Sequence, residues 1–232
     1  MSKPEIELPE HLKKSLRALM LAQMGNDALG LYEIELFDWY VKETDAVLNQ
    51  MLSCEHAYIQ EQIAAGVPDI NDSGIVAVDY YTKRIRYSHV IYLTSLLETC
   101  LEQACSNLTI AVGKESMPFD LAELKGDQWS TKRKFLERYG HFEFPEDIWS
   151  ELRVLIDVRN YLVHENGNTV NVSNDERNKL NKRHGINIEG YEFKVEAAYI
   201  QHASQAVKSF VQAIEERVGE VIRRAQRPQS IA

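Results

Sequence analysis

Apolar side chains recur at intervals of three and four residues in one long stretch of the chain. They are Val90, Leu93, Leu97, Leu101, Ala104 and Leu108. Because an α-helix turns once in about 3.6 residues, side chains at this spacing line one face of a helix. The stripe predicts a helix over about 78–112 that must bury this face against other elements. The chain is therefore expected to fold by packing helices on helices.

Helical patterns account for most of the remaining sequence. They cover about 11–23, 27–65, 131–140, 145–166, 174–183 and 196–224, and the stretch 27–65 forms either one helix or two. Ser130 is the expected N-cap of the helix over 131–140, and Pro145 the first residue of the next helix. The segment 186–195, INIEGYEFKV, predicts a small hairpin. The predicted fold class is all-α, with about five to seven helices.

One turn-rich loop separates two of the long helical stretches. It runs from Gly66 through Pro68 and the segment DINDSG at 69–74. No internal repeat or low-complexity tract is present in the sequence. We place the domain division after this loop, with an N-terminal helical extension at 1–77 and a helical core at 78–232.

The charge balance limits the kind of nucleic-acid contact the protein can make. The formal net charge is −9, which argues against a protein that coats nucleic acid, because phosphate binding requires surplus Lys and Arg. A local basic cleft stays compatible with this charge. Two basic clusters occur, Lys83, Arg84 and Arg86 in one and Lys132, Arg133, Lys134 and Arg138 in the other. Solvated helix faces are the simplest account of both.

Cysteine usage and hydropathy indicate where the protein works. Cys54, Cys100 and Cys105 form no CxxC pair, so neither a disulfide framework nor a zinc site is expected. Cys100 and Cys105 lie in an apolar helical stretch and are expected to be buried thiols. No signal-peptide pattern is visible, and no apolar run approaches the roughly 18 residues that span a bilayer. The sequence predicts a cytoplasmic protein that needs neither membrane, metal ion nor cofactor.

The helix expected over 145–166 ends in a group of polar residues. Its apolar stripe comprises Ile148, Leu152, Leu155 and Ile156, and the next position at helical spacing is Arg159. A guanidinium in line with a buried stripe is costly unless it is paired or faces a cleft. Asn160 and His164 are four residues apart and therefore share one face of the helix. The run 159–164 is the strongest candidate for a functional site.

Arg, Asn and His together suit the cleavage of RNA. Attack by a 2′-hydroxyl requires a group that moves protons near neutral pH, which His does. It also requires a cation beside the charged phosphoryl oxygens, which Arg supplies in a bidentate fashion. Asn can orient the imidazole or bind a phosphate oxygen. A basic residue in the last turn also interacts favourably with the helix dipole, so spacing alone gives a weak case.

The run RNYLVHENG, residues 159–167, resembles the R-x4–6-H motif of the HEPN superfamily, and more closely its RNxxxH form in HEPN ribonucleases. The segment YSHVIYLTSLLETCLEQACSNL, residues 87–108, is similar to the first core helix of that superfamily. The resemblance covers about residues 80–225. It implies a HEPN-like helical bundle over the core, and a metal-independent endoribonuclease of the toxin or phage-defence type.

The resemblance also implies site residues and partners. Arg159 and His164 match the catalytic pair, Asn160 matches the polar residue that follows the arginine, and Glu98 matches an additional acidic residue on the first core helix. Such domains typically form homodimers in which two motifs face one cleft. RNA, including tRNA, is the expected substrate, and an antitoxin or a defence-complex subunit the expected partner. A related group that pairs with nucleotidyltransferase antitoxins has a tyrosine soon after the histidine, whereas Glu165 and Asn166 follow here.

The sequence therefore leaves three alternative hypotheses about the function. The first is the endoribonuclease, with a 2′,3′-cyclic phosphate as product. The second is a non-catalytic RNA- or nucleotide-binding subunit of a defence complex, which the acidic charge favours. The third is a structural helical oligomer, which leaves Arg159 unexplained. Weaker site candidates are His89 in the first core helix and the pair Tyr80 and Tyr81, which could stack on bases.

Overall fold

A computed structural model describes residues 30–112 and 126–225 of the chain, so the helix expected over 11–23 lies outside the described residues. Within them the protein forms six helices and one two-stranded hairpin, which confirms the all-α class. The elements are α2 (Leu31–Ala64), α3 (Ser73–Val112), α4 (Gln128–Gly140), α5 (Glu146–His164), α6 (Asn174–Asn181), β1 (Ile186–Glu189), β2 (Glu192–Val195) and α7 (Ala197–Ala225).

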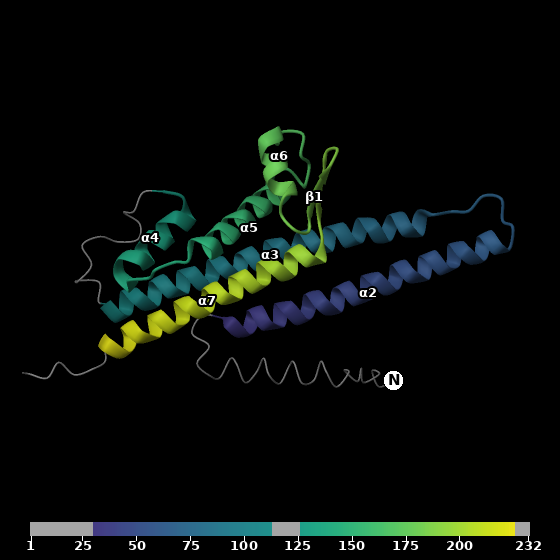
Figure 1. The fold of residues 1–232 in the computed structure, drawn as a ribbon. Coiled ribbons are helices and arrows are strands. Elements are labelled where there is room, and N and C mark those ends of the chain that lie inside the picture. Colours follow the sequence, from purple (N-terminus) through teal and green to yellow (C-terminus); the bar gives the residue numbers. More distant parts are fainter. Residues whose placement is uncertain (1–29, 113–125, 226–232) are drawn as a thin grey trace, which may run out of the picture.

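The long helices α2, α3 and α7 lie side by side, and α3 is the element on which the others pack (Figure 1). All six members of the predicted stripe on α3 are buried, at 0–1% exposure. They share one core with Phe37 of α2, Leu152 of α5 and Phe210 of α7. The apolar spacing of α3 therefore fixes the centre of the fold, because every neighbouring helix buries its own stripe there.

The N-terminal part of the described chain belongs to this same core. Residues 31–64 form a single helix, which decides between the one-helix and two-helix readings of this stretch. Ile34, Phe37 and Val41 of α2 are at most 2% exposed and lie in the core cluster. The division we placed between residues 77 and 78 falls within α3. The distal half of α2 and the start of α3 extend beyond the other helices (Figure 1).

The start of α4 differs from the prediction. The N-cap is Asp127, whose carboxylate accepts hydrogen bonds from Trp129 N at 3.0 Å and Ser130 N at 2.9 Å. Ser130, the expected cap, instead lies in the first turn and donates its hydroxyl to Asp127 at 2.6 Å. Both residue types are good caps, and the upstream one begins the helix at Gln128.

The end of α5 is fixed by backbone geometry. The amides of Glu165 and Gly167 both donate to the carbonyl of Tyr161, at 3.1 and 3.3 Å. Asn166 and Gly167 have left-handed φ values of 51° and 73°. A Cβ on residue 167 would collide with the ring of Tyr87 on α3, so this position requires glycine. The helix therefore stops at His164, two residues before the predicted end at residue 166.

The region after α5 forms a small cap over α3. Ser173 and Glu176 make a capping box at the start of α6, and β1 and β2 pair in antiparallel register with Ile186 opposite Val195. The hairpin prediction is therefore confirmed. Cys100 and Cys105 are buried thiols as expected, and Cys54 is exposed. Among the described residues, no helix has the length and apolar character needed to cross a membrane.

Candidate functional site

The structure corrects the position of Arg159 on α5. The buried line of this helix runs through Leu155, Val158 and Leu162, and not through residue 159. Apolar side chains that are three or four residues apart both lie on one face of a helix. The sequence pattern placed Arg159 on the buried face, whereas the buried residue is Val158. Arg159 is half-buried at the edge of the apolar face. Its guanidinium therefore reaches solvent without the cost of full burial.

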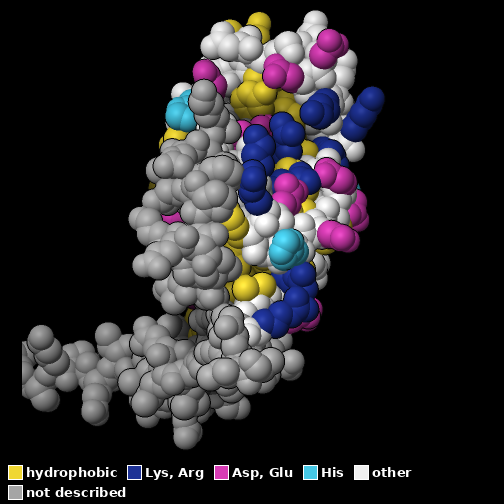
Figure 2. Space-filling model, turned by 90° about the vertical axis from the view of Figure 1, so that its left-hand side faces the viewer, with side chains coloured by type: hydrophobic (Ala, Val, Ile, Leu, Met, Phe, Trp, Pro, Cys, Tyr) yellow, Lys and Arg dark blue, Asp and Glu magenta, His cyan; other side chains and the backbone are white. Residues whose placement is uncertain are grey.

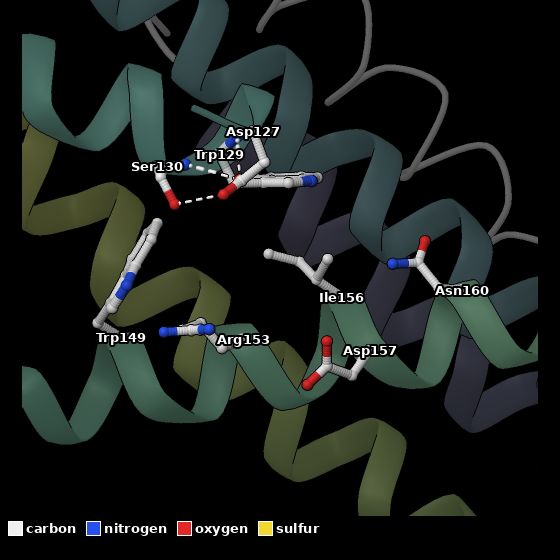
Figure 3. Close-up of a pocket in the computed structure, with 8 residues that line it drawn as sticks. All are labelled: Asp127, Trp129, Ser130, Trp149, Arg153, Ile156, Asp157 and Asn160. Atoms are coloured by element: carbon white, nitrogen blue, oxygen red, sulfur yellow. Dashed lines mark hydrogen bonds between the residues drawn. The ribbon is translucent and has the colours of Figure 1, made fainter. Parts of the chain in front are cut away.

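Arg159 and Asn160 act as a pair. Nη1 of Arg159 donates a hydrogen bond to Oδ1 of Asn160 at 3.1 Å. This bond sets the orientation of the amide, because the oxygen must face the guanidinium. The amide nitrogen is then directed toward the space between α4 and α5 (Figure 3).

His164 is the last residue of α5 and is exposed. The structure therefore places Arg159, Asn160 and His164 within the last two turns of one helix, with the exposed residues Asn160 and His164 one turn apart. Near the following loop, Nη1 of Arg84 on α3 donates to Oδ1 of Asn166. The Arg84 guanidinium also lies 5.2 Å from the ring centre of exposed Tyr80. A cation and an aromatic ring thus lie beside this end of α5.

The first basic cluster is largely engaged in holding the fold. Lys83 forms an ion pair with Glu192 of β2, and Arg86 pairs with Asp45 of α2 at 3.4 Å. Tyr87 donates its hydroxyl to the carbonyl of Phe193. Burial, and then the charge of Glu192, raise the pKa of Tyr87 to about 12, so the phenol keeps its proton. The contacts of Lys83 and Tyr87 dock the hairpin on α3, and that of Arg86 joins α3 to α2. Arg84 is the member of this cluster that lies beside the motif.

Arg177 of α6 is a residue that the sequence reasoning missed. Its guanidinium donates to three backbone carbonyls, those of Val172 at 3.2 Å, Gly190 at 2.6 Å and Thr169. It therefore ties the loop that follows the motif to the turn of the hairpin. No sequence signal marks such a role, because every residue offers a carbonyl.

The contact that the structure gives Glu98 is with α4. Its carboxylate lies 3.9 Å from Nζ of Lys132 on α4, which also pairs with Glu102 at 2.8 Å. Through this contact with Lys132, Glu98 helps to hold α4 against α3.

A cavity lies between α4 and α5 and includes one residue of the motif. It encloses about 200 Å³ and is lined by Asp127, Trp129, Ser130, Trp149, Arg153, Ile156, Asp157 and Asn160. The two indole rings come from different helices, and the polar groups of α5 project toward the cavity (Figure 3). Lys and Arg side chains gather on the end of the molecule where α4 lies (Figure 2). The sequence reasoning missed this cavity, because it forms only when α4 and α5 pack.

Two carboxylates at this cavity differ in their environment. Hydrogen bonds from Ser130 hold the pKa of Asp127 below its ordinary value. Partial burial raises the pKa of Asp157, against the charges of Lys179 and Arg153, which lower it. Asp127 is therefore committed to capping α4, whereas Asp157 has no hydrogen bond from within the described chain. Asp157 is the carboxylate that can take part in binding.

The remaining histidine candidate, His89, lies in the core. It is 1% exposed, and neither ring nitrogen has a hydrogen-bond partner among the described residues. The rings of Phe37 and Tyr40 contact it edge-on, at 5.9 and 5.2 Å between centres. Burial lowers the pKa of His89, although the charge of Asp45 raises it. Burial therefore favours the neutral form of His89, and this residue is not among those that line the cavity.

No family model matches the chain, and neither the curated proteins nor the solved structures provide a match. Within residues 30–112 and 126–225, no group of three or more His, Cys, Asp or Glu side chains is arranged to hold a metal ion.

Proposed function

We propose that the protein is an endoribonuclease of the HEPN type, with Arg159, Asn160 and His164 as its motif. The observation that carries the proposal is the arrangement at the end of α5. A histidine, an arginine and an asparagine lie within the last two turns of one helix and reach solvent, and the arginine is bonded to the asparagine. An RNA phosphate can approach this end of the helix without displacing core side chains.

Each residue has a chemical role in this proposal. The 2′-hydroxyl of a ribose attacks the adjacent phosphorus, the bond to the 5′-oxygen breaks, and a 2′,3′-cyclic phosphate and a 5′-hydroxyl result. His164 moves a proton, either from the 2′-hydroxyl or to the leaving 5′-oxygen. Arg159 binds the phosphoryl oxygens as negative charge develops on them. Asn160 positions Arg159 or the substrate, and the chemistry uses no metal ion.

Two proton transfers are required, and one motif supplies one histidine. We infer that the site is composite, with His164 of a second copy making the other transfer. The surface of α2 and α3 supports self-association, since large apolar side chains are exposed there. They include Val47 at 56%, Met51 at 44%, Tyr58 at 52%, Val76 at 62% and Tyr81 at 56% exposure. Scattered apolar residues are ordinary on surfaces, but a series along one helical hairpin is typical of an interface.

A second candidate function is a non-catalytic RNA- or nucleotide-binding subunit of a defence complex. It is favoured by the net charge of −9 and by the engagement of Lys83 and Arg86 in ion pairs with Glu192 and Asp45. Under this proposal the motif binds a phosphate without cleaving RNA. Both proposals place the protein in the cytoplasm, with an antitoxin or a complex subunit as an additional partner.

Cleavage of RNA in the presence of EDTA distinguishes the two candidates. The purified protein is incubated with a mixed pool of RNA, beside Arg159→Ala, His164→Ala and the matched control His184→Ala, which removes an exposed loop histidine. The nuclease proposal expects cleavage by the wild type and by the control only. Intact RNA in every sample, or equal cleavage by all four proteins, would contradict it.

A further inference from the structure

The cavity between α4 and α5 has the size and walls of a pocket for one planar ring system. Its volume of about 200 Å³ lies below the roughly 300–1,000 Å³ of pockets that hold drug-sized ligands. Trp129 of α4 and Trp149 of α5 line it from different helices, and Ile156 of α5 lines it as well (Figure 3). Aromatic walls of this kind hold nucleobases by stacking in proteins that bind single strands.

The two indole rings are fixed before any ligand enters. The ammonium group of Lys132 lies 6.0 Å from the ring centre of Trp129, and the guanidinium of Arg133 lies 5.0 Å from that of Trp149. Trp149 is 5% exposed and also contacts Phe144 and Phe210. Because the rings are packed in place, little side-chain entropy is lost when a base enters.

The polar groups of the cavity present a specific hydrogen-bonding pattern. Asp157 offers two carboxylate oxygens, which accept hydrogen bonds and do not donate them when ionised. Asn160 offers its amide nitrogen, because its oxygen already accepts a bond from Arg159 at 3.1 Å. Asp157 and Asn160 are three residues apart on α5 and both line the cavity. These two side chains therefore form a set of two acceptors beside one donor, and Arg153 adds further donors at the cavity.

Guanine is the RNA base whose edge matches this set. It has two adjacent donors, N1–H and N2–H, beside one acceptor, O6. Adenine and cytosine each place a single donor beside an acceptor, and uracil has one donor between two acceptors. Only guanine can give both oxygens of Asp157 a hydrogen bond while it accepts one from Asn160.

We infer that this cavity is a guanine-binding subsite that selects the nucleotide next to the scissile phosphate. The role of the subsite in cleavage rests on the proposed nuclease function. The identity of the bound base is inferred from the cavity alone. Asn160 belongs to both the cavity and the motif, and His164 lies one turn further along α5. Exposed Arg153 lies at the same cavity and supplies a positive charge for the phosphate of the bound nucleotide.

Binding, measured without cleavage, tests the subsite. Fluorescence anisotropy is followed for a labelled single-stranded RNA octamer that carries one guanine, with a 2′-deoxy sugar at that nucleotide to prevent attack at its phosphate. Matched octamers carry inosine or adenine instead. Inosine lacks only the N2 amino group, so it should bind about tenfold more weakly, as expected for loss of one hydrogen bond to a charged acceptor. Adenine should bind more weakly still.

Variants assign the preference to particular side chains. Asp157→Asn should abolish the difference between guanine and inosine, whereas Asp147→Asn, the same change at an exposed position outside the cavity, should preserve it. Trp129→Leu should weaken binding of every octamer by about 5- to 150-fold through lost stacking. Circular dichroism of each variant shows whether α4 is retained. A Trp129→Leu protein that has lost helix is replaced by Trp129→Phe, which should keep the guanine preference.

Equal affinity for the guanine, inosine and adenine octamers would overturn the inference, and so would an Asp157→Asn protein that keeps the wild-type preference. Competition by guanosine monophosphate shows whether the subsite binds a guanine within RNA or a free guanine nucleotide. If the free nucleotide binds as tightly as the octamer, the subsite serves a free ligand and its proposed place beside the scissile phosphate is wrong. Because the octamers are not cleaved, guanine-selective binding without any RNA cleavage would contradict the nuclease proposal alone.

Discussion

Two arginines near the end of α5 occupy contrasting environments. Arg177 donates to the carbonyls of Val172, Gly190 and Thr169, so each of its three guanidinium nitrogens is bonded to the backbone of its own protein. Within the described part of the chain, Arg159 makes one hydrogen bond, to Asn160, and remains half-exposed. A guanidinium has five donors, so Arg159 keeps donors that a phosphate can use. The comparison separates an arginine that builds the fold from one that is held ready for a ligand.

The largest expected loss of stability belongs to Arg177→Ala. It leaves three carbonyls without their donor, and hydrogen bonds to charged groups are each worth about 1.5–3 kcal/mol. Water can hydrate some of these carbonyls in the variant, so the loss should be smaller than the sum of three bonds. We expect the free energy of unfolding to fall by about 2–4 kcal/mol. Urea denaturation measures it. Arg177→Lys should recover part of the loss, and an Arg177→Ala protein as stable as the wild type would remove the contrast with Arg159.

Gly167→Ala should be the next most costly change. The left-handed φ of 73° and the collision of the new Cβ with the Tyr87 ring both oppose it. A strained φ alone costs about 1–3 kcal/mol. We expect thermal unfolding at a lower temperature, and weaker docking of the loop that follows His164. The control is Gly190→Ala at a turn with φ 58°, where a Cβ meets no neighbour, so the same backbone strain acts without the collision. Equal losses in both variants would exclude a role for Tyr87.

The stability of the fold should depend on pH through His89. Burial lowers the pKa of His89 below 6.5, so the unfolded chain takes up this proton before the folded chain does. The free energy of unfolding should therefore be unaffected above pH 6.5 and fall below it, by at most about 1.4 kcal/mol per pH unit. The charged groups that face His89 are Asp45 on α2 and Arg86 on α3.

His89→Leu tests this dependence, because it removes the titrating group. Its free energy of unfolding, measured by urea denaturation between pH 7.5 and 5, should decline less steeply than that of the wild type. His184→Ala, a change at an exposed histidine, should leave the wild-type slope unaltered. A His89→Leu protein with the wild-type slope would show that another group controls acid stability.

Arg159→Ala should have the smallest effect on stability, within about 0.5 kcal/mol, because its guanidinium lies at the edge of the core. Binding of RNA at the motif should nevertheless fall, since the cation for the phosphate is lost. Urea denaturation and anisotropy on the same preparation give both values. A loss of several kcal/mol would make Arg159 a structural residue like Arg177, and the comparison would fail.

The sequence predicted the parts of the fold that depend on local pattern. The stripe on α3, the end of α5 before Gly167 and the hairpin at 186–195 follow from spacing and turn chemistry, and each was confirmed. The cap of α4 was wrong because Asp127 and Ser130 compete for the same role and spacing does not rank them. On α5 the buried residue is Val158 and not Arg159. A helix permits apolar spacings of three and four equally, so only the packing against other helices decides between the two positions.

The site was only partly predictable, for a different reason. The motif is contiguous, so its residues could be named from the sequence. The cavity, by contrast, joins Trp129 of α4 to Asp157 of α5, and Arg177 acts on carbonyls that carry no side-chain signal. Glu98 was expected among the site residues, and its contact with Lys132 of α4 could not be predicted from sequence spacing. Contacts of this kind depend on how separate elements pack together, and no periodic pattern in the sequence predicts them.

The chemistry of the RNA ends tests the central claim most directly. A defined single-stranded RNA containing guanine is incubated with the wild type and with His164→Ala in EDTA, and the products are identified by mass spectrometry. The account predicts fragments that end in a 2′,3′-cyclic phosphate after guanine and begin with a 5′-hydroxyl, formed at least about a hundredfold faster by the wild type. Fragments with 5′-phosphate ends, or equal rates for both proteins, would contradict it.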